Sequence, residues 1–224
     1  MENPSSFQTI SKFGVLTYLQ RDIVISLNDK RNNDYEDKSE KIEKYLNSRV
    51  KHQDNIKTGY FEGKNLILIM AESFDTYAID ETLTPNIYQM QQNSWNFNQY
   101  YSPLYFRNTA DTEFMSQTGL YVHSHESLTM EAFKDNAFPN TLPKLYNQMG
   151  YGTYSFHNYT DFFYPRSEFH PDTLGYDEFY GAVELGMLEE LSGIILRHEW
   201  QSDLDLVNET MDILKDKEEP FFTY

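Results

Sequence analysis

The sequence predicts an α/β fold, built as a mostly parallel sheet with helices on both faces. Two observations lead to this prediction. Residues 65–70 form a short unbroken apolar run, typical of a strand, and a helix signal follows at residue 84. The same order then recurs, with helical patterns alternating with short apolar segments. Such alternation is most simply built as parallel strands joined by helical crossovers.

The composition supports one folded domain with a polar N-terminal arm. The 224 residues are 39% hydrophobic and 16% aromatic, enough to form a core. The formal charge of −17 repels phosphate polymers, so we expect no nucleic-acid partner. The absence of cysteine excludes disulfides and thiolate chemistry. We expect residues 1–62 to be an arm or linker, in which Ser39 caps a short helix, and residues 63–224 to be the folded region.

The first half of the folded region predicts one strand and two helices. Continuous apolar residues at 65–70 indicate a strand that is covered on both faces. Thr84 and Pro85 begin a helix that extends to about Asn93, with Thr84 as the N-cap and Pro85 at the first helical position. A second short helix is expected to end at Gly119.

The second half repeats the pattern. Asn140 or Thr141 is expected to cap a helix that leads into a strand at residues 151–156. Ser202 caps a further helix, and residues 220–224 begin another strand. A natural domain rarely finishes on an interior strand, so we expect a domain that is truncated at its C-terminus. The longest aliphatic run is far below the ~20 residues of a membrane helix, so the chain as given is expected to be soluble.

Two polar residues directly follow predicted strands. Glu72 follows the first strand and His157 follows the second, and ligands of open α/β sheets bind at the carboxyl ends of the strands. A carboxylate there is suited to a divalent cation, although Glu72 could equally cap a helix or form a salt bridge. His123 and His125 have a spacing compatible with a metal, but a solvated loop explains them as well.

Thr109 lies where a helix is expected to begin. Backbone N–H groups and the helix dipole favour anions at such a terminus. A threonine hydroxyl placed there could meet a phosphate and act as a nucleophile. The alternative is that Thr109 is simply an N-cap.

A third candidate cluster follows the strand at residues 151–156. It contains His157, Phe163, Tyr164 and Arg166. Arginine is shaped for bidentate contact with phosphate or carboxylate, and the two aromatic residues could form an apolar wall beside a polar headgroup. The alternative is a loop packed by its aromatic residues, with Arg166 in a surface ion pair.

Together these segments resemble a known family. Residues 64–74, 84–86 and 108–114, followed by shorter blocks that include 163–166, resemble the extracellular catalytic domain of lipoteichoic acid synthases. These enzymes are phosphoglycerol transferases of the alkaline phosphatase and sulfatase superfamily. The resemblance covers about residues 63–224. It implies an alkaline phosphatase/sulfatase-like fold, of which this is the N-terminal part, and membrane helices that precede residues 1–62 in the natural protein.

The resemblance also implies roles for individual residues. Glu72 and Thr109 would bind one divalent metal, Mn²⁺ or Mg²⁺, and Thr109 would be the nucleophile. The substrate pocket would use His157, Phe163, Tyr164 and Arg166, with Tyr164 standing where tryptophan is common in the family. An Asp-His pair and another histidine of the family lie beyond the position of Tyr224, so we expect this polypeptide alone to be inactive.

The implied activity is transfer of glycerophosphate from phosphatidylglycerol to a growing lipoteichoic-acid-type polymer, through a phospho-threonine intermediate. The expected location is the outer face of a Gram-positive-type cell membrane. Two alternatives stay open. One is a related phosphoethanolamine or sugar phosphoglycerol transferase, and the other is a non-catalytic module that binds glycerophosphate polymers.

Overall fold

The chain divides into two compact units, Met1–Tyr60 and Phe61–Tyr224. The computed structural model describes residues 15–16, 19–20, 23–24, 27, 35–50, 53–101, 109–122, 128–160, 164–188, 190–191, 194–195 and 202–224. In the first unit, helix α2 (Tyr35–Ser48) starts before Ser39, so the expected cap at Ser39 is wrong. The apolar side chains of Ile42, Tyr45 and Leu46 on this helix are exposed. No helix among the described residues has the length and apolarity to cross a bilayer.

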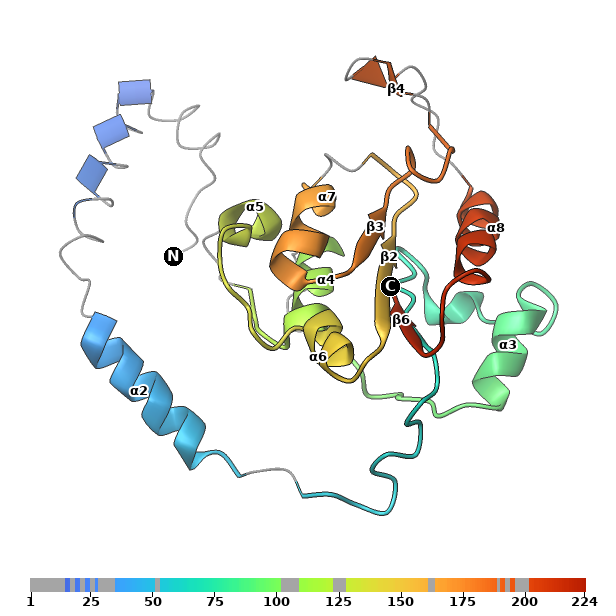
Figure 1. Cartoon of the computed structure of the whole chain (residues 1–224), viewed down its shortest axis with the longest axis horizontal. Coiled ribbons are helices and arrows are strands. Elements are labelled where there is room, and N and C mark those ends of the chain that lie inside the picture. Colours follow the sequence, from blue (N-terminus) through green and yellow to red (C-terminus); the bar gives the residue numbers. More distant parts are fainter. Residues whose placement is uncertain are drawn as a thin grey trace. The chain divides into compact units, whose positions relative to one another are not determined.

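The second unit alternates strands and helices along the chain (Figure 1). Its described elements are β1 (Leu66–Ile67), η1 (Thr76–Ala78), α3 (Pro85–Gln92), α4 (Thr109–Thr118), α5 (Thr129–Phe133), α6 (Leu142–Gln148), β2 (Gly152–Phe156), α7 (Arg166–Glu168), η2 (Phe169–Leu174), β3 (Glu178–Tyr180), β4 (Glu190–Leu191), β5 (Ile194–Ile195), α8 (Asp203–Leu214) and β6 (Phe221–Thr223).

Four strands form a parallel sheet in the order β1-β6-β2-β3. Phe222 of β6 lies opposite Leu66 on one side and Thr153 on the other, so β6 is an interior strand. Strands β4 and β5 form a separate antiparallel pair. The predicted α/β class with a mostly parallel sheet is therefore confirmed.

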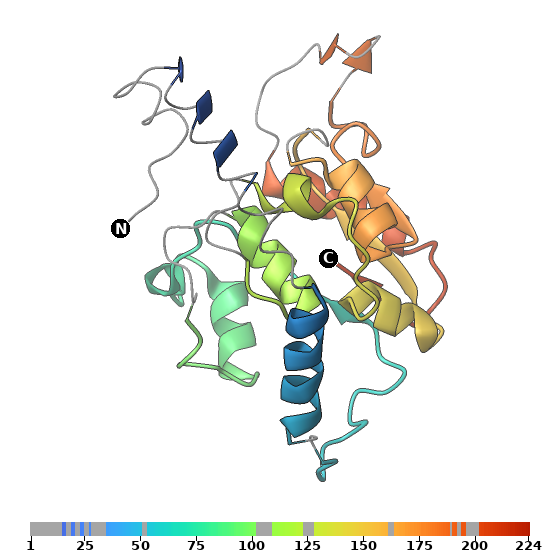
Figure 2. The same ribbon diagram turned by 90° about the vertical axis from the view of Figure 1, so that its left-hand side faces the viewer.

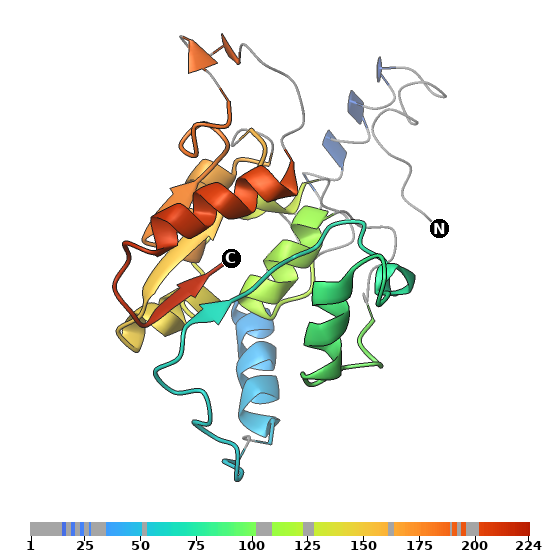
Figure 3. The ribbon, with the colours of Figure 1, turned by 90° about the vertical axis from the view of Figure 1, so that its right-hand side faces the viewer.

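Alternate side chains of β6 build two cores on opposite faces of the sheet. Helices α4, α6 and α7 cover one face of the sheet (Figure 2). Phe222 is fully buried on this face, and its ring stacks on Tyr146 of α6 with centroids 4.9 Å apart. Helix α8 covers the other face (Figure 3). Phe221 packs there with Tyr154 and with Leu214 of α8. This alternation follows from the two-residue period of a strand. Helices cover both faces, as the sequence predicts.

The first strand differs from its prediction. Only Leu66–Ile67 is a strand, although the N–H of Leu68 continues the pairing by donating to the carbonyl of Thr223 at 2.8 Å. Ile67 and Ile69 are 53% and 75% exposed, so the expected cover on both faces is absent in the described part of the chain. The physical reason is that β1 is an edge strand of the described sheet.

The three helices begin at the predicted residues, but one of the three predicted N-cap side chains makes no capping hydrogen bond. Thr84 occupies the N-cap of α3, yet its hydroxyl donates to a carbonyl of the preceding turn at 2.7 Å and caps no helix N–H. Thr141 does cap α6, since its hydroxyl accepts from the N–H of Lys144 at 3.4 Å. Ser202 caps α8 in the same way, accepting from the N–H of Asp205 at 3.2 Å.

Candidate active site

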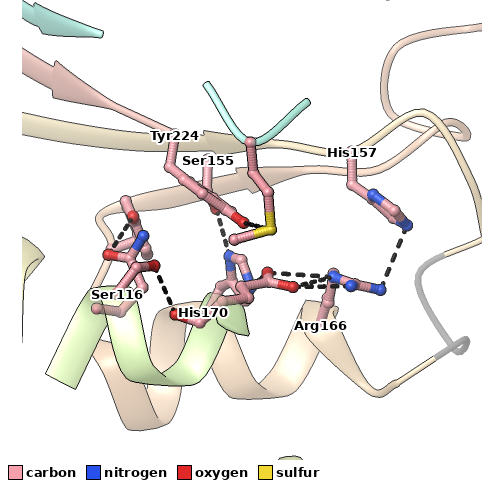
Figure 4. A network of polar contacts seen from close by, with 10 residues as sticks. Ser116, Ser155, His157, Arg166, His170 and Tyr224 are labelled. Atoms are coloured by element: carbon pink, nitrogen blue, oxygen red, sulfur yellow. Dashed lines mark hydrogen bonds and ion pairs between the residues drawn. The ribbon is translucent and has the colours of Figure 1, made fainter. Parts of the chain in front are cut away.

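The carboxyl ends of β1, β2 and β6 bring three chain segments together. His157 directly follows β2, and Tyr224 directly follows β6. The N–H of Phe156 donates to the carbonyl of Tyr224 at 2.8 Å, and the hydroxyl of Tyr224 donates to the sulfur of Met70, which lies beyond β1, at 3.4 Å (Figure 4). This is the edge at which parallel α/β sheets bind ligands.

A buried ion pair lies beside this edge. Glu113, on α4, is 1% exposed, and Arg166, the first residue of α7, is 4% exposed. Nη2 of Arg166 donates to Oε2 of Glu113 at 2.7 Å, and Nε donates to both carboxylate oxygens at 3.1 and 3.2 Å. The predicted alternative of a surface ion pair is therefore wrong, because the pair is buried among α4, α7 and the sheet.

His170, in η2, completes the contacts of the Glu113 carboxylate. Its Nε2 lies 2.7 Å from Oε1 of Glu113, and its Nδ1 lies 3.0 Å from the hydroxyl of Ser155 on β2 (Figure 4). An ionised carboxylate can only accept, so Nε2 carries a proton. The His170 ring stacks on Tyr176 with centroids 5.5 Å apart, and the side chain is 1% exposed.

The network keeps Glu113 ionised. Burial by itself would raise the pKa of this carboxyl, but the hydrogen bond and charge of His170, with the charge of Arg166, outweigh burial and lower the pKa to about 2. A negative charge on Glu113 therefore persists over the whole neutral range.

His157 is held neutral beside the guanidinium. Burial, and after it the positive charge of Arg166, lower the pKa of His157 to about 4. Its Nε2 lies 3.4 Å from Nη1 of Arg166 (Figure 4). Since Arg166 only donates, Nε2 of His157 is the acceptor. His157 can therefore accept hydrogen bonds at pH 7.

Tyr164 packs against the same guanidinium. The carbon Cζ of Arg166 lies 5.4 Å from the centre of the Tyr164 ring, a cation–π distance. Tyr164 has φ +58°, a conformation that is costly for a bulky residue and that clusters at functional sites. Phe163, the other aromatic residue of this candidate pocket, lies outside the described residues.

Glu72 and Thr109 are joined to this network by no described hydrogen bond. Glu72 lies in an exposed turn after β1 and accepts from the hydroxyl of Ser73 at 2.8 Å. Thr109 is the half-buried first residue of α4, as the sequence predicts. His123 and His125 are outside the described residues.

The described residues supply only part of a site for the divalent metal that the resemblance implies. Within the described ranges no three His, Asp or Glu side chains are grouped so that they could hold a metal ion. Glu72 and Thr109 offer the oxygen atoms that Mn²⁺ or Mg²⁺ prefers, but such ions take about six ligands. These two residues therefore do not make a complete site.

Sequence reasoning missed Glu113, His170 and Ser155. A signal was present in the spacing, since Glu113 lies four residues after Thr109 and His170 four residues after Arg166. Residues four apart share a helix face. However, helical glutamate is mostly exposed, so spacing alone did not indicate burial.

Comparison with known proteins agrees with this fold. The family described as Sulfatase matches residues 64–224. The chain belongs to the sulfatase family. Its match spans the sheet, α4 and the buried network around Arg166.

Three relatives narrow the position within the sulfatase family. Lipoteichoic acid synthase 2 of Bacillus subtilis is 26% identical over 192 residues, which is 81% of this chain and 28% of that protein. Lipoteichoic acid synthase-like YvgJ of Bacillus subtilis is 25% identical over 197 residues, 84% of this chain and 30% of that protein. The crystal structure of the lipoteichoic acid synthase LtaP from Listeria monocytogenes matches with a TM-score of 0.62 and 26% identity, over 74% of this chain and 40% of that chain.

These matches confirm the resemblance to lipoteichoic acid synthases and the sulfatase-like fold. They support an enzyme of the transferase or hydrolase type. The chain spans less than a third of the length of the two curated relatives.

Proposed function

We propose that the chain is part of a phosphoglycerol transferase that moves glycerophosphate from phosphatidylglycerol to a growing lipoteichoic-acid-type polymer. The observation that supports this best is the Glu113–Arg166 ion pair, because it ties the helix that begins at Thr109 to an arginine suited to phosphate. The synthase matches support the same activity.

In this proposal Thr109 is the nucleophile. Its oxygen forms a bond to phosphorus while the bond from phosphorus to the diacylglycerol oxygen breaks, and the proton of Thr109 ends on diacylglycerol. The N-terminal N–H groups of α4 stabilise the negative charge that develops on phosphate. The oxygen of a polymer hydroxyl then forms a bond to phosphorus while the bond from phosphorus to Thr109 breaks, and the proton of that hydroxyl returns to Thr109.

Arg166, His157, Tyr164 and Phe163 form the proposed substrate pocket. Arg166 donates to a phosphate oxygen, and neutral His157, whose Nε2 accepts from Arg166, donates its Nδ1–H to an oxygen of the glycerol headgroup. The aromatic rings provide the apolar wall, and Tyr164 also packs on the guanidinium.

We propose Glu72 and Thr109 as two of the ligands of a divalent cation, Mn²⁺ or Mg²⁺. Such an ion supplies positive charge that favours ionised hydroxyl oxygens. Because the described residues offer no complete site, we expect the 224-residue chain alone to give no turnover. The proposed location is the outer face of a cell membrane, where the lipid donor lies.

The test is diacylglycerol release from labelled phosphatidylglycerol by the product of the complete reading frame that contains this chain. Thr109→Ala should abolish release, whereas Thr109→Ser, which keeps a hydroxyl, should retain part of it. Undiminished release by Thr109→Ala would refute the proposed nucleophile. Turnover by the 224-residue chain would refute its expected inactivity.

The same preparations separate the alternatives. Preference for a phosphatidylethanolamine donor, or for a sugar acceptor, would identify one of the related transferases. A binding module would release no diacylglycerol from any donor and would keep its affinity for glycerophosphate polymer in Thr109→Ala.

A further inference from the structure

We propose that Glu113 is a positioning residue, which fixes the guanidinium of Arg166 in the orientation that binds the phosphate of the substrate. This inference rests on the proposed function, in which Arg166 contacts phosphate. Neither the resemblance nor the predicted site residues assign a role to Glu113.

The geometry of the ion pair carries the proposal. Glu113 occupies Nε and Nη2 of Arg166, which is one edge of the planar guanidinium, at 2.7 to 3.2 Å. The remaining nitrogen, Nη1, is directed to His157 at the carboxyl end of β2. A carboxylate on the Nε edge thus determines which edge of the guanidinium faces the ligand-binding end of the sheet (Figure 4).

Glu113 is itself fixed from a second direction. Oε1 also accepts from Nε2 of His170 at 2.7 Å, and His170 contacts Ser155 of β2 at 3.0 Å. Rotation of the carboxylate would break both sets of bonds in a site from which water is excluded. The contacts therefore run from β2 through His170, Glu113 and Arg166 and return to β2 at His157.

Glu113 also connects the two halves of the proposed chemistry. It lies four residues after Thr109 on α4, one helical turn along the same face. A shift of α4 relative to α7 would strain the ion pair. The nucleophile and the phosphate-binding arginine are thereby held in one rigid unit, which is the arrangement that catalysis by orientation requires.

A purely electrostatic role of Glu113 predicts a change in anion affinity opposite to the one that a positioning role predicts. Glu113 places a negative charge beside the proposed anion site, so its removal would strengthen anion binding if charge alone mattered. A positioning role predicts weaker binding, because glutamine presents an N–H₂ group to a donor-only arginine and the guanidinium loses its fixed orientation. The sign of the change therefore distinguishes the two roles.

The experiment measures the dissociation constant of sn-glycerol 3-phosphate for the 224-residue chain at pH 7.5. The signal is the side-chain ¹H–¹⁵N resonance of Arg166 Nε, assigned with Arg166→Lys. Glu113→Gln should weaken binding about tenfold or more, the loss expected for a charge-assisted contact. The matched control is Glu168→Gln, which removes the same charge from the exposed side of α7 and should leave binding unchanged or slightly tighter.

Binding by Glu113→Gln that equals or exceeds that of Glu168→Gln would overturn the positioning role while leaving Arg166 as a phosphate contact. Arg166→Lys lacks the reporting resonance, so its affinity is measured by isothermal titration calorimetry beside the wild type. If that affinity is unchanged, or the wild-type resonance does not respond to ligand, the phosphate role of Arg166 fails and the inference is overturned with it. Should Glu113→Gln not fold, Glu113→Asp tests position alone, because it keeps the charge and shortens the reach. It should bind more weakly than Glu168→Asp, and equal binding by these two variants would overturn the positioning role.

Discussion

Replacing His157 with glutamine is expected to remove an acid sensitivity of the fold. His157 has a pKa of about 4 in the folded chain, against 6.5 for the unfolded chain, because it is buried and adjacent to Arg166. Folding therefore favours neutral imidazole. Above pH 6.5 the imidazole is neutral in both states and costs the fold nothing, whereas between pH 6.5 and 4 the unfolded chain takes up a proton first and the fold loses stability.

The magnitude follows from these two pKa values. At pH 5 these two pKa values shift the unfolding equilibrium constant about 30-fold towards the unfolded chain, which corresponds to about 2 kcal/mol of lost stability. Acidification also reduces the self-repulsion of a chain with a charge of −17, which acts in the opposite direction. The wild type alone therefore cannot isolate the contribution of His157.

The assay compares urea denaturation of the wild type and His157→Gln at pH 7.5, 6.0 and 5.0. Glutamine keeps a polar acceptor without titrating, so the self-repulsion cancels in the difference. The free energy of unfolding of the wild type should fall relative to the variant by about 2 kcal/mol between pH 7.5 and 5.0. A difference that stays constant over this range would refute the assignment of a buried, neutral His157.

Three further outcomes are expected from chemical denaturation. Arg166→Ala leaves the carboxylate of Glu113 buried without its guanidinium and should cost about 3–5 kcal/mol, whereas Lys215→Ala, at an exposed ion pair, should leave stability nearly unchanged. Phe222→Ala opens a cavity between the sheet and α6 and should cost about 3–5 kcal/mol; a loss no larger than that of a surface substitution would contradict the packing. Ser202→Ala removes the N-cap of α8 and should cost about 1 kcal/mol, with a matching small loss of helical circular dichroism.

Local patterns predicted the alternation of strands and helices, because caps and apolar runs act over a few residues. Thr141 and Ser202 do cap their helices, and residues 221–223 do form a strand. Exposure of Ile67 was not predictable, because it depends on which strands lie beside β1 and not on β1 itself.

In the candidate site, too, local patterns predicted some residues, and others depend on contacts that are distant in the sequence. His157 and Arg166 could be found from their position after a strand, and the structure brings them within 3.4 Å of each other. Glu113 could not, since its role depends on partners 53 and 57 residues away along the chain. The four-residue spacing from Thr109 indicates a shared helix face but does not reveal which distant residues Glu113 contacts. The roles of all the predicted site residues stay predictions: Glu72, Thr109, His157, Phe163, Tyr164 and Arg166.

The side chains of β2 alternate between the polar network on one face of the sheet and the apolar layer on the other. Ser155 and His157 hold the two ends of the polar network on one face, while Tyr154 and Phe156 pack toward α8 on the other. Because the two sets interleave, a shift of one residue would bury the rings in the polar network and turn both anchors toward the apolar face. A substitution of Tyr154 or Phe156 therefore acts first on the packing of one face, whereas an insertion or deletion of one residue within β2 would disrupt both layers at once.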